Sequence, residues 1–415
     1  MAFSKFVEAC TGQQWIFLIL VSMIKFFSGI ISSLQAPFFP KEAENHGLTA
    51  TEYGLAISLF DISALITSFV FGYVSKGNRE TLIFKVSPFI EGLSCILFGC
   101  TSLIQNKLIF IGIVILLRAT EGLGNALYLI TSIKETSRYF EEIEVPVSMQ
   151  ITFNSVGFST GPFIGGLIYA GLGFMGPFYT IGGILTAIGL FNVICLDKNQ
   201  KAQEEAPSIE NENYKDLLKR TPVLVLLFTL LLHSLSWRLI FVGFEPHIRD
   251  FNLSATEVGL VFMIGELTYT LTIPFWAKMA TTSNYMFVIL LFSAVIALGF
   301  SLLGSVQILP LDKTLIIISI GYGIFGVGTS ANYNFAILIF TKEVRASIAG
   351  NSLWSMVFSF GNIAGYFGGG FLIDVLTFRG ASFIVVCLYI FNCILFAVLS
   401  CKSLRDEDKK LLQNK

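Results

Sequence analysis

Charged residues inside apolar runs are the side chains of this sequence that could do chemistry. The acids are Asp61, Glu91, Glu121, Glu245 and Glu266, the fixed bases are Lys25, Arg118 and Arg238, and His233 is titratable. A charge at the centre of a bilayer costs about 2.5 to 3.5 kcal/mol on an insertion scale, so it is seldom without a role. The excess of acids over fixed bases suits a cationic ligand or a bound proton. The alternative is that the charges pair with one another.

Composition indicates what kind of protein must hold these charges. Of the 415 residues, 54% are hydrophobic and 13% charged, and the mean hydropathy is +0.74. Too little polar surface remains to cover a soluble globule, so we expect a multi-pass membrane protein rather than a soluble enzyme. The sequence contains no phosphate-binding loop of the kind that ATP-driven pumps carry. The seven cysteines have no regular spacing, so we expect neither a disulfide framework nor a metal site. We also expect no cofactor and no nucleic-acid partner.

Apolar runs of about 20 residues, each long enough to cross about 30 Å of hydrocarbon, recur along the whole chain. We count twelve, at residues 15–39, 51–75, 81–104, 108–132, 146–170, 174–196, 222–246, 255–277, 285–308, 314–340, 347–373 and 380–401. The first run is too long for a signal peptide and is not followed by a small-residue cleavage pattern. The sequence therefore predicts an all-α membrane protein with twelve transmembrane helices.

The polar segments between these runs predict how the chain is divided and oriented. Most Lys and Arg lie at the two ends and in the even-numbered connections, which predicts cytoplasmic termini. The longest polar segment mixes acids with bases, as a cytoplasmic linker does. We expect an N-terminal six-helix bundle at 1–197, this linker at 198–221, and a C-terminal six-helix bundle with a short cytoplasmic tail at 222–415.

A glycine-rich stretch, GFSTGPFIGG, occurs at 157–166 and its glycine spacing recurs later in the chain at a constant offset. Glycines at every fourth position lie on one helix face and let a second helix approach closely, and a mid-helix proline among them predicts a kink. The residues concerned are Gly157, Gly161, Pro162, Gly165 and Gly166 in the first copy and Gly361, Gly365, Gly369 and Gly370 in the second. These two copies predict an internal repeat.

Other segments repeat in the same order. LTATEYGL at 48–55 matches LSATEVGL at 253–260, and the same offset places Asp61 on Glu266. Gly122 and Gly124 similarly fall on Gly326 and Gly328. We therefore predict two parallel repeats of six helices, related by an axis normal to the membrane.

Four segments resemble known families. RATEGLGNA at 118–126 resembles the fourth-helix motif of the major facilitator superfamily, and GFSTGPFIGG resembles its fifth-helix antiporter motif. APFFPKEAENHG at 36–47 and FEPHIRDFNLSATEVGLVF at 244–262 resemble the vesicular amine transporters, particularly the polyamine branch. The resemblance implies the major facilitator fold and transport by alternating access. GYVSKGNRE at 72–80 departs from the superfamily, because it lacks the Asp-Arg pair of the loop after helix 2.

In the resembled fold, helices 1, 4, 7 and 10 line a central cavity. Substrate contacts are therefore expected from Ser28, Glu121, Asn125, Tyr128, Trp237, Tyr322, Asn332 and Glu245. Ser28 occupies the position at which monoamine members carry an acid. Trp237 and Tyr322 could offer ring faces to an ammonium, or simply pack. Arg118 is expected to brace the cavity by pairing with Glu121, one turn away.

Four further residues are candidates for proton coupling. In the resembled fold, helices 2 and 8 lie between the halves, so protonation of Asp61 or Glu266 could switch an interfacial hydrogen bond, although either could instead be a constant partner of a base. Glu91 is a third candidate. His233 could relay protons because an imidazole titrates near neutral pH, and the alternative is a satisfied interior histidine.

Lys25 lies about 15 Å along the first helix, too deep to reach the surface easily. It could pair with Glu91 or Glu121. Alternatively, it indicates that the transported compound is something other than a polyamine.

Glu245 is the acid that we expect to neutralise a transported ammonium. It precedes Pro246, which removes a backbone donor and frees carbonyl oxygens beside the carboxylate. The amine transporter family has an acid and a proline at this place in helix 7. The alternative is that Glu245 lies at the membrane edge and pairs with Arg249, four residues on.

The predicted function is proton-coupled antiport of a small organic cation, a polyamine or a monoamine, by a monomer in a vesicle membrane. The alternative is a transport-inactive homologue that acts as a membrane sensor or trafficking partner. Leu411-Leu412, preceded by Glu407, resembles an acidic dileucine signal and predicts an intracellular vesicle or endolysosomal membrane, with the plasma membrane as the alternative. Asn252-Leu-Ser254 is a glycosylation triplet on the non-cytoplasmic side.

Overall fold

The computed structural model describes residues 10–74, 79–195, 214–279, 285–304, 312–344 and 348–413, and every regular element within these ranges is helical. Side chains from residue 399 onward lie outside the described part, and they include those of Leu411 and Leu412. Most of the expected linker, at residues 198–213, also lies outside it. Nine stretches in these ranges are long and apolar enough to cross a membrane. One of them, Ser352–Val398, contains two helices that meet at a kink.

The first half of the chain forms six long helices. They are α2 (Gly12–Ser33), α4 (Ala50–Val74), α5 (Arg79–Gly99), α6 (Lys107–Tyr139), α7 (Glu144–Leu172) and α8 (Met175–Cys195). The short α3 (Phe39–Asn45) lies between α2 and α4. Helix α6 continues beyond the predicted end at residue 132, because its last turns remain α-helical although their residues are polar.

The second half also forms six long helices, although some are fused. They are α10 (Thr221–Ile248), α11 (Ala255–Met279), α12 (Tyr285–Leu303), α13 (Leu315–Glu343), then α14 (Ile348–Ile363) continued through the π-helical η3 (Ala364–Gly368), and α15 (Gly369–Gln413). A single-turn helix, α9 (Tyr214–Leu217), precedes them. Thr377, with φ of 61°, breaks α15 into the end of the eleventh helix and the whole of the twelfth. The predicted twelve-helix fold is confirmed.

The repeated LTATE and LSATE segments are helix starts. Thr49 N donates to Glu52 Oε2 at 2.8 Å and Glu52 N donates to Thr49 Oγ1 at 3.3 Å. Ser254 and Glu257 make the same two bonds at 2.8 and 3.3 Å. These are capping boxes, which satisfy backbone donors that a helix leaves free at its first turn. The sequence repeat thus has a local physical cause, the start of α4 and of α11.

The glycine-rich stretch packs α7 against α2 at backbone distance. A Cβ at Gly157 would overlap the carbonyl oxygen of Phe26, and one at Gly165 would overlap that of Leu34. In the second copy, a Cβ at Gly365 would meet the carbonyl oxygen of Leu235 in α10. The close approach predicted for both glycine stretches is confirmed.

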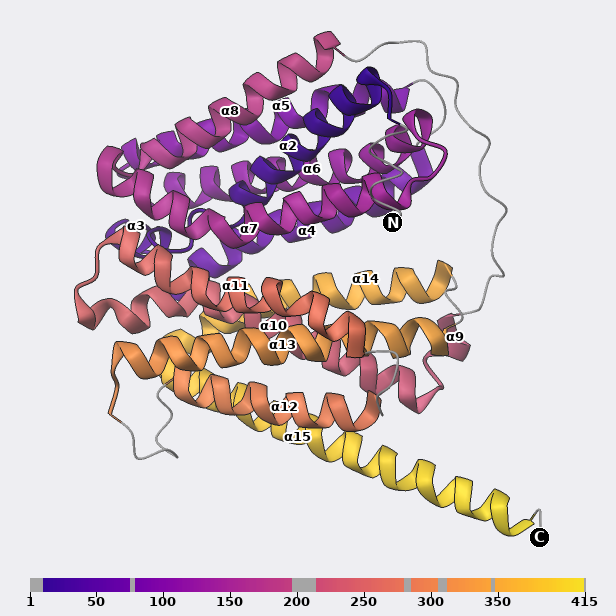
Figure 1. Cartoon of the computed structure of the whole chain (residues 1–415). Helices are drawn as coiled ribbons and strands as arrows, with labels where there is room; N and C mark the ends of the chain where they lie inside the picture. The colour runs from indigo at the N-terminus through magenta and orange to yellow at the C-terminus, as the bar shows by residue number, and fades with distance from the viewer. Residues whose placement is uncertain are drawn as a thin grey trace. The chain divides into compact units, whose positions relative to one another are not determined.

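The chain forms two compact units, Met1–Ala206 with Asn252–Met263, and Pro207–Phe251 with Ile264–Lys415. In the first unit, α2 packs on α7, α4 on α6, and α5 on both α6 and α8 (Figure 1). In the second unit, α12 packs on α13 and α15, and α10 packs on α14. The start of α11 belongs to the first unit, where Thr256 Oγ1 donates to the Gly166 carbonyl at 3.4 Å. The predicted domain limits at 197 and 222 stay a prediction.

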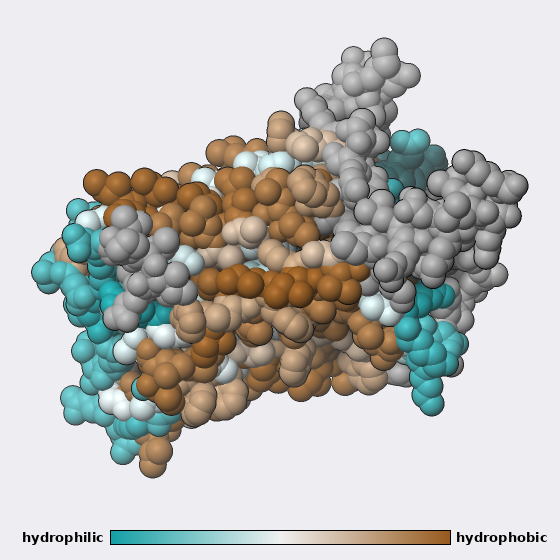
Figure 2. All heavy atoms as spheres, turned by 90° about the horizontal axis from the view of Figure 1, so that it is seen from below, coloured by the Kyte–Doolittle hydropathy of each residue, from teal (hydrophilic) through white to brown (hydrophobic). Residues whose placement is uncertain are grey.

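Apolar side chains are gathered on the surface as well as inside. Figure 2 shows one face on which hydrophobic residues occupy the middle and hydrophilic residues lie toward the two ends. Leu298, Ile316 and Phe391 are among the exposed large apolar side chains of the second unit. A broad exposed apolar surface of this kind suits contact with lipid.

Candidate functional site

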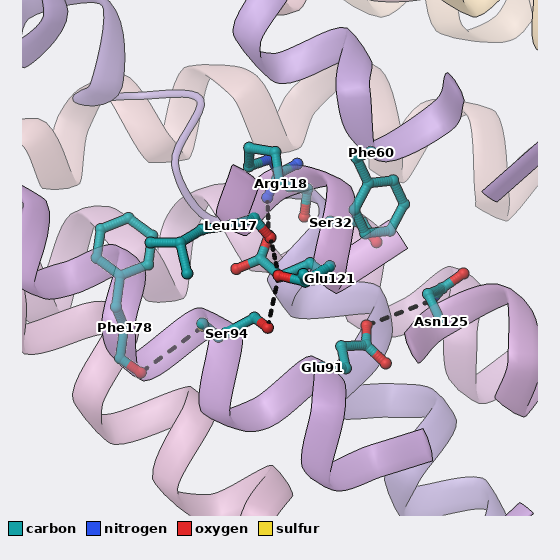
Figure 3. Close-up of polar contacts among 12 residues, drawn as sticks. Ser32, Phe60, Glu91, Ser94, Leu117, Arg118, Glu121, Asn125 and Phe178 are labelled. Carbon is teal, nitrogen blue, oxygen red and sulfur yellow. Dashed lines mark hydrogen bonds and ion pairs between the residues drawn. The ribbon is translucent and has the colours of Figure 1, made fainter. Parts of the chain in front are cut away.

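The first unit holds a buried polar cluster built from α2, α5 and α6. Ser28 Oγ donates to Glu91 Oε1 at 2.6 Å. Asn125 Nδ2 lies 2.6 Å from Ser28 Oγ and 3.3 Å from Glu91 Oε1. Figure 3 shows the contact between Glu91 and Asn125. The structure thus brings together three residues that the sequence singled out on three different helices, and Glu91 at their centre is 0% exposed.

Two glycines of α6 let this cluster form. A Cβ at Gly124 would lie 2.8 Å from the backbone nitrogen of Glu91 in α5, and one at Gly122 would overlap the carbonyl oxygen of Phe60 in α4. Helix α6 therefore lies at backbone distance from both neighbours. This is a packing reason for the two glycines of the RATEGLGNA segment.

Arg118 and Glu121 form the ion pair that their spacing predicted. Arg118 Nη1 lies 2.5 Å from Glu121 Oε2, and the two side chains are 2% and 1% exposed (Figure 3). The guanidinium also lies over the Phe60 ring, with its carbon 5.0 Å from the ring centroid. With its amide oriented to satisfy both neighbours, Gln35 accepts from Arg118 Nη2 at 3.1 Å. Arg118 is therefore held in place from three sides.

Lys25 forms no close ion pair with either acid that the sequence offered it. Its side chain is 6% exposed, and its ammonium lies over the Tyr128 ring, 5.0 Å from the centroid. Within the described ranges the ammonium makes no hydrogen bond, and no ion pair within 4.0 Å joins it to Glu91 or Glu121. Glu91 still acts on it electrostatically. Glu121 binds Arg118, and Ser28 and Asn125 bond to Glu91 Oε1, while Glu91 Oε2 has no partner in the described residues. Pairing of Lys25 with Glu91 therefore stays a prediction.

Glu266 on α11 occupies a different kind of surroundings in the second unit. It is 5% exposed, and its Oε1 has no hydrogen-bond partner in the part of the chain that the structure describes. Arg238 is the charged group that acts on it. The ring of Tyr322 covers Gly265, the residue before it. Glu266 is thus a buried carboxylate with one unsatisfied oxygen among aromatic side chains.

Asp61 and Glu266 occupy matching places in the two repeats. In each repeat, a glycine of the motif helix packs on the residue just before the acid: Gly122 on Phe60, and Gly326 on Gly265. The surroundings nevertheless differ, because Asp61 is half-buried whereas Glu266 is buried.

Aromatic rings surround this part of the second unit. The Trp237 ring lies 5.7 Å from Tyr269 at 90°, 6.1 Å from Tyr322 and 4.9 Å from Phe325. Tyr322 is 0% exposed and Trp237 is 9% exposed. The sequence named Trp237 and Tyr322, and edge-to-face packing of this kind fixes both rings.

Arg238 of α10 contacts a residue that the sequence analysis missed. Arg238 Nη1 donates to Tyr366 Oη at 3.2 Å, and the guanidinium carbon lies 5.2 Å from the Tyr366 ring centroid. Tyr366 lies in η3, at the place that Pro162 holds in the first glycine stretch. Comparing the two copies residue by residue would have indicated it, since π-helical segments often occur at functional sites.

His233 lies one turn before Trp237 on α10. Its Nδ1 has no hydrogen-bond partner within the described residues, and its ring packs 4.8 Å from that of Tyr333. The described residues therefore leave this ring nitrogen without a partner, and the role of His233 in proton relay stays a prediction.

Glu245 forms the ion pair with Arg249 that was the alternative to a role in binding an ammonium. Arg249 Nε and Nη2 donate to its two carboxylate oxygens at 3.0 and 2.6 Å. The Glu245 side chain is 6% exposed and that of Arg249 is 37% exposed. A bidentate Arg–carboxylate pair already neutralises this acid, so a role for Glu245 as counter-charge requires a substrate to compete with Arg249.

Asn332 forms hydrogen bonds with a neighbouring helix. Its Nδ2 donates to Ser293 Oγ at 2.8 Å, and Asn392 Nδ2 donates to the same oxygen at 3.0 Å. The three side chains join α13, α12 and α15, and hydropathy alone gave no signal for Ser293 or Asn392.

In the described part of the chain, no three His, Cys, Asp or Glu side chains gather closely enough to hold a metal ion.

A family model described as Major Facilitator Superfamily matches residues 21–233 and 226–414 of the chain. The MFS-type transporter SLC18B1 of Mus musculus is 26% identical over 371 residues, which cover 84% of this chain and 78% of that protein. SLC18B1 of Homo sapiens is 26% identical over 387 residues, covering 89% of this chain and 83% of that protein.

A solved structure has the same fold. It is a bacterial homologue of the human lysosomal transporter Spinster in an inward-facing, unoccupied conformation, with a TM-score of 0.74 and 13% identity. The match covers 96% of this chain and 99% of that one. At such low identity the likeness concerns the fold alone.

Proposed function

We propose, on the premise that this chain belongs to the Major Facilitator Superfamily, that it exchanges small organic amines for protons. Membership of the family makes the chain a multi-pass membrane transporter of small molecules. Amine chemistry, proton coupling and the vesicle membrane are the proposed parts. The observation that carries the amine chemistry and the proton coupling is the buried Glu266 carboxylate, which has an unsatisfied oxygen.

A carboxylate in apolar surroundings requires compensation. Burial of an ionised acid without adequate partners costs far more than burial of its protonated form or of an acid that binds a cation. Near Glu266, Arg238 supplies one positive charge, but its guanidinium also binds Tyr366. A proton or an ammonium on Glu266 would complete the compensation.

Competition for one carboxylate provides a mechanism of exchange. When Glu266 binds a proton it cannot neutralise an ammonium, and when it neutralises an ammonium it has no need of a proton. Release of one ligand on one side of the membrane then favours binding of the other. Combined with alternating access, in which two repeats rock about a site near the midplane, this competition produces antiport.

The aromatic rings favour an amine as the organic ligand. Trp237, Tyr322 and Tyr269 present ring systems close to one another in the second unit, and an ammonium is attracted to the face of such rings. The resemblance of residues 36–47 and 244–262 to vesicular amine transporters supports the same class of substrate. Glu245 is proposed as a second carboxylate that an amine could reach by displacing Arg249.

Other predicted roles remain proposals. Asp61, Glu91 and His233 are further candidates for carrying protons. We propose that the protein is a monomer with both termini in the cytoplasm, in an intracellular vesicle membrane to which the Leu411-Leu412 signal directs it.

Uptake by proteoliposomes tests the function. Wild-type protein is expected to accumulate radiolabelled tyramine or putrescine when the lumen is made acidic, and to stop when the pH gradient is collapsed. Glu266→Gln should abolish this pH-driven uptake because a glutamine amide cannot exchange a proton. Glu257→Gln is the matched control, since it makes the same change on an exposed residue of α11.

Uptake that persists unchanged in both Glu266→Gln and Asp61→Asn would remove both acids as coupling residues. Absence of pH-driven uptake of any amine by the wild type would instead favour the transport-inactive alternative.

A further inference from the structure

Lys25 is the exception among the buried bases of the first unit. Arg118 binds Glu121, and Lys85 Nζ lies 3.4 Å from the Val193 carbonyl. The half-buried Arg138 is also paired, with its Nη1 2.7 Å from Glu135. The Lys25 ammonium, in contrast, lies over the Tyr128 ring and makes no hydrogen bond or ion pair within the described ranges. An ammonium has three hydrogens to donate, and none of them reaches an oxygen of the described residues.

A second unsatisfied donor lies beside it. Tyr128 is 1% exposed, and its Oη has no hydrogen-bond partner in the described part of the chain. The Tyr128 ring that carries this hydroxyl is the one beneath the Lys25 ammonium. One charged donor and one neutral donor from α2 and α6 therefore lie next to each other without acceptors.

The neighbouring acid does not serve as that acceptor. Lys25 precedes Ser28 by three residues, which places both on the same face of α2. Ser28 and Asn125 bond to Glu91 Oε1, and Oε2 has no partner in the described residues. No ion pair within 4.0 Å joins either oxygen to Lys25. Glu91 thus balances the charge of Lys25 at a distance without satisfying its hydrogens.

We infer that Lys25 and Tyr128 bind a carboxylate carried by the transported amine, so that the substrate is a zwitterion of the amino-acid type. The amine half of this statement rests on the proposed function, and the carboxylate half rests on the two unsatisfied donors. A carboxylate has two oxygens and accepts from both donors at once. A polyamine, which has no acidic group, would instead bring a like charge toward Lys25.

Ligand sets that differ by one charged group test the inference on detergent-purified, full-length protein. The first set is tyrosine, tyramine, which lacks the carboxylate, and 3-(4-hydroxyphenyl)propionate, which lacks the amine. The second is ornithine and putrescine. Wild-type protein should bind the amino acid of a set about 10- to 100-fold more tightly than its decarboxylated amine, as expected for a hydrogen bond to a charged group.

Substitution at position 25 should change this ratio. Lys25→Met should remove the preference by weakening the amino acid and not the amine, whereas Lys25→Arg, which keeps the charge and the donors, should retain part of it. Lys85→Met is the matched control because it removes another buried lysine of the same unit. Its ratio should equal that of the wild type.

Each outcome separates the inference from the proposed function. The inference is overturned if the wild type prefers the decarboxylated amine, if it binds no member of either set, or if Lys25→Met keeps the wild-type ratio. Equal binding of tyrosine and 3-(4-hydroxyphenyl)propionate would retain the carboxylate site and contradict the amine. A preserved binding preference without pH-driven uptake would contradict proton coupling alone.

Discussion

The buried charges of the two units are satisfied in different ways. In the first unit, Arg118 binds Glu121 and Glu91 accepts from Ser28 and Asn125, which leaves the base Lys25 without an oxygen partner in the described residues. In the second unit, the buried acid Glu266 keeps one oxygen without a described partner, and the Tyr322 ring covers the preceding residue, Gly265. Each repeat therefore holds one buried acid, Glu91 or Glu266, with an oxygen that lacks a partner in the described residues, and the first repeat also leaves the Lys25 ammonium without an acceptor there.

The features that the repeats share are structural. Both have a capping box before the second helix of the repeat, and in both, motif glycines bring helices to backbone distance. The polar side chains attached to that common framework differ. Packing therefore constrains the positions that match between the copies, while the chemistry of the two units has diverged.

The largest effect is expected where two buried charges bind each other. Arg118→Met or Glu121→Met alone should lower the free energy of unfolding by about 3 to 5 kcal/mol because each leaves an uncompensated charge, whereas the double variant should recover much of this loss. Lys219→Met breaks the exposed pair with Asp216, whose side chains are 76% and 62% exposed, and should cost about 1 kcal/mol or less. Thermal unfolding in detergent measures all four. Equal losses of unfolding free energy in Arg118→Met and Lys219→Met would contradict the expected difference between the buried and the exposed ion pair.

Amine affinity should depend on the acid that lacks a complete set of partners. Glu266→Gln should weaken binding of a transported amine by about 2 to 5 kcal/mol, as loss of a desolvated counter-charge does. Glu245→Gln should cost much less because Arg249 already neutralises Glu245. Isothermal titration of both variants decides between them. A larger loss at Glu245 would make that residue the counter-charge.

Replacing a glycine by alanine should destabilise the protein where the added Cβ would meet backbone atoms of another helix. Gly157→Ala should lower the free energy of unfolding by about 1 to 3 kcal/mol, because the carbonyl of Phe26 cannot move without shifting α2. Gly171→Ala lies on the same helix with nothing within 4 Å of the added Cβ, so it should be neutral or slightly stabilising. Thermal unfolding compares them, and similar values would mean that the helices separate easily.

The smallest expected effects are those of the capping boxes, and they should be the same in both repeats. Thr49→Ala and Ser254→Ala each remove one capping hydroxyl and should each cost about 1 kcal/mol. Thr51→Ala, inside the first turn of α4, is the control. A cost at one box only would show that the repeats differ at their helix starts as well as in their charges.

Contacts along one helix could be predicted from the sequence. The spacing of Arg118 and Glu121 predicted their pair, and that of Glu245 and Arg249 supplied the pairing alternative, because residues three or four apart on a helix are neighbours whatever surrounds it. The twelve apolar runs, the repeat and the close approach at the glycines also followed from composition and spacing. These features need no knowledge of how helices are arranged.

Contacts between helices were decided by the tertiary structure. The bond of Glu91 to Ser28 and Asn125, the contact of Arg238 with Tyr366 and the absence of a described partner for the Lys25 ammonium depend on how each helix is rotated about its axis. Hydropathy leaves that rotation open in helices that are apolar on most sides, because lipid and protein interior are similarly apolar. The sequence therefore determined which residues carry charge at membrane depth, and packing determined which of them remain available to a ligand.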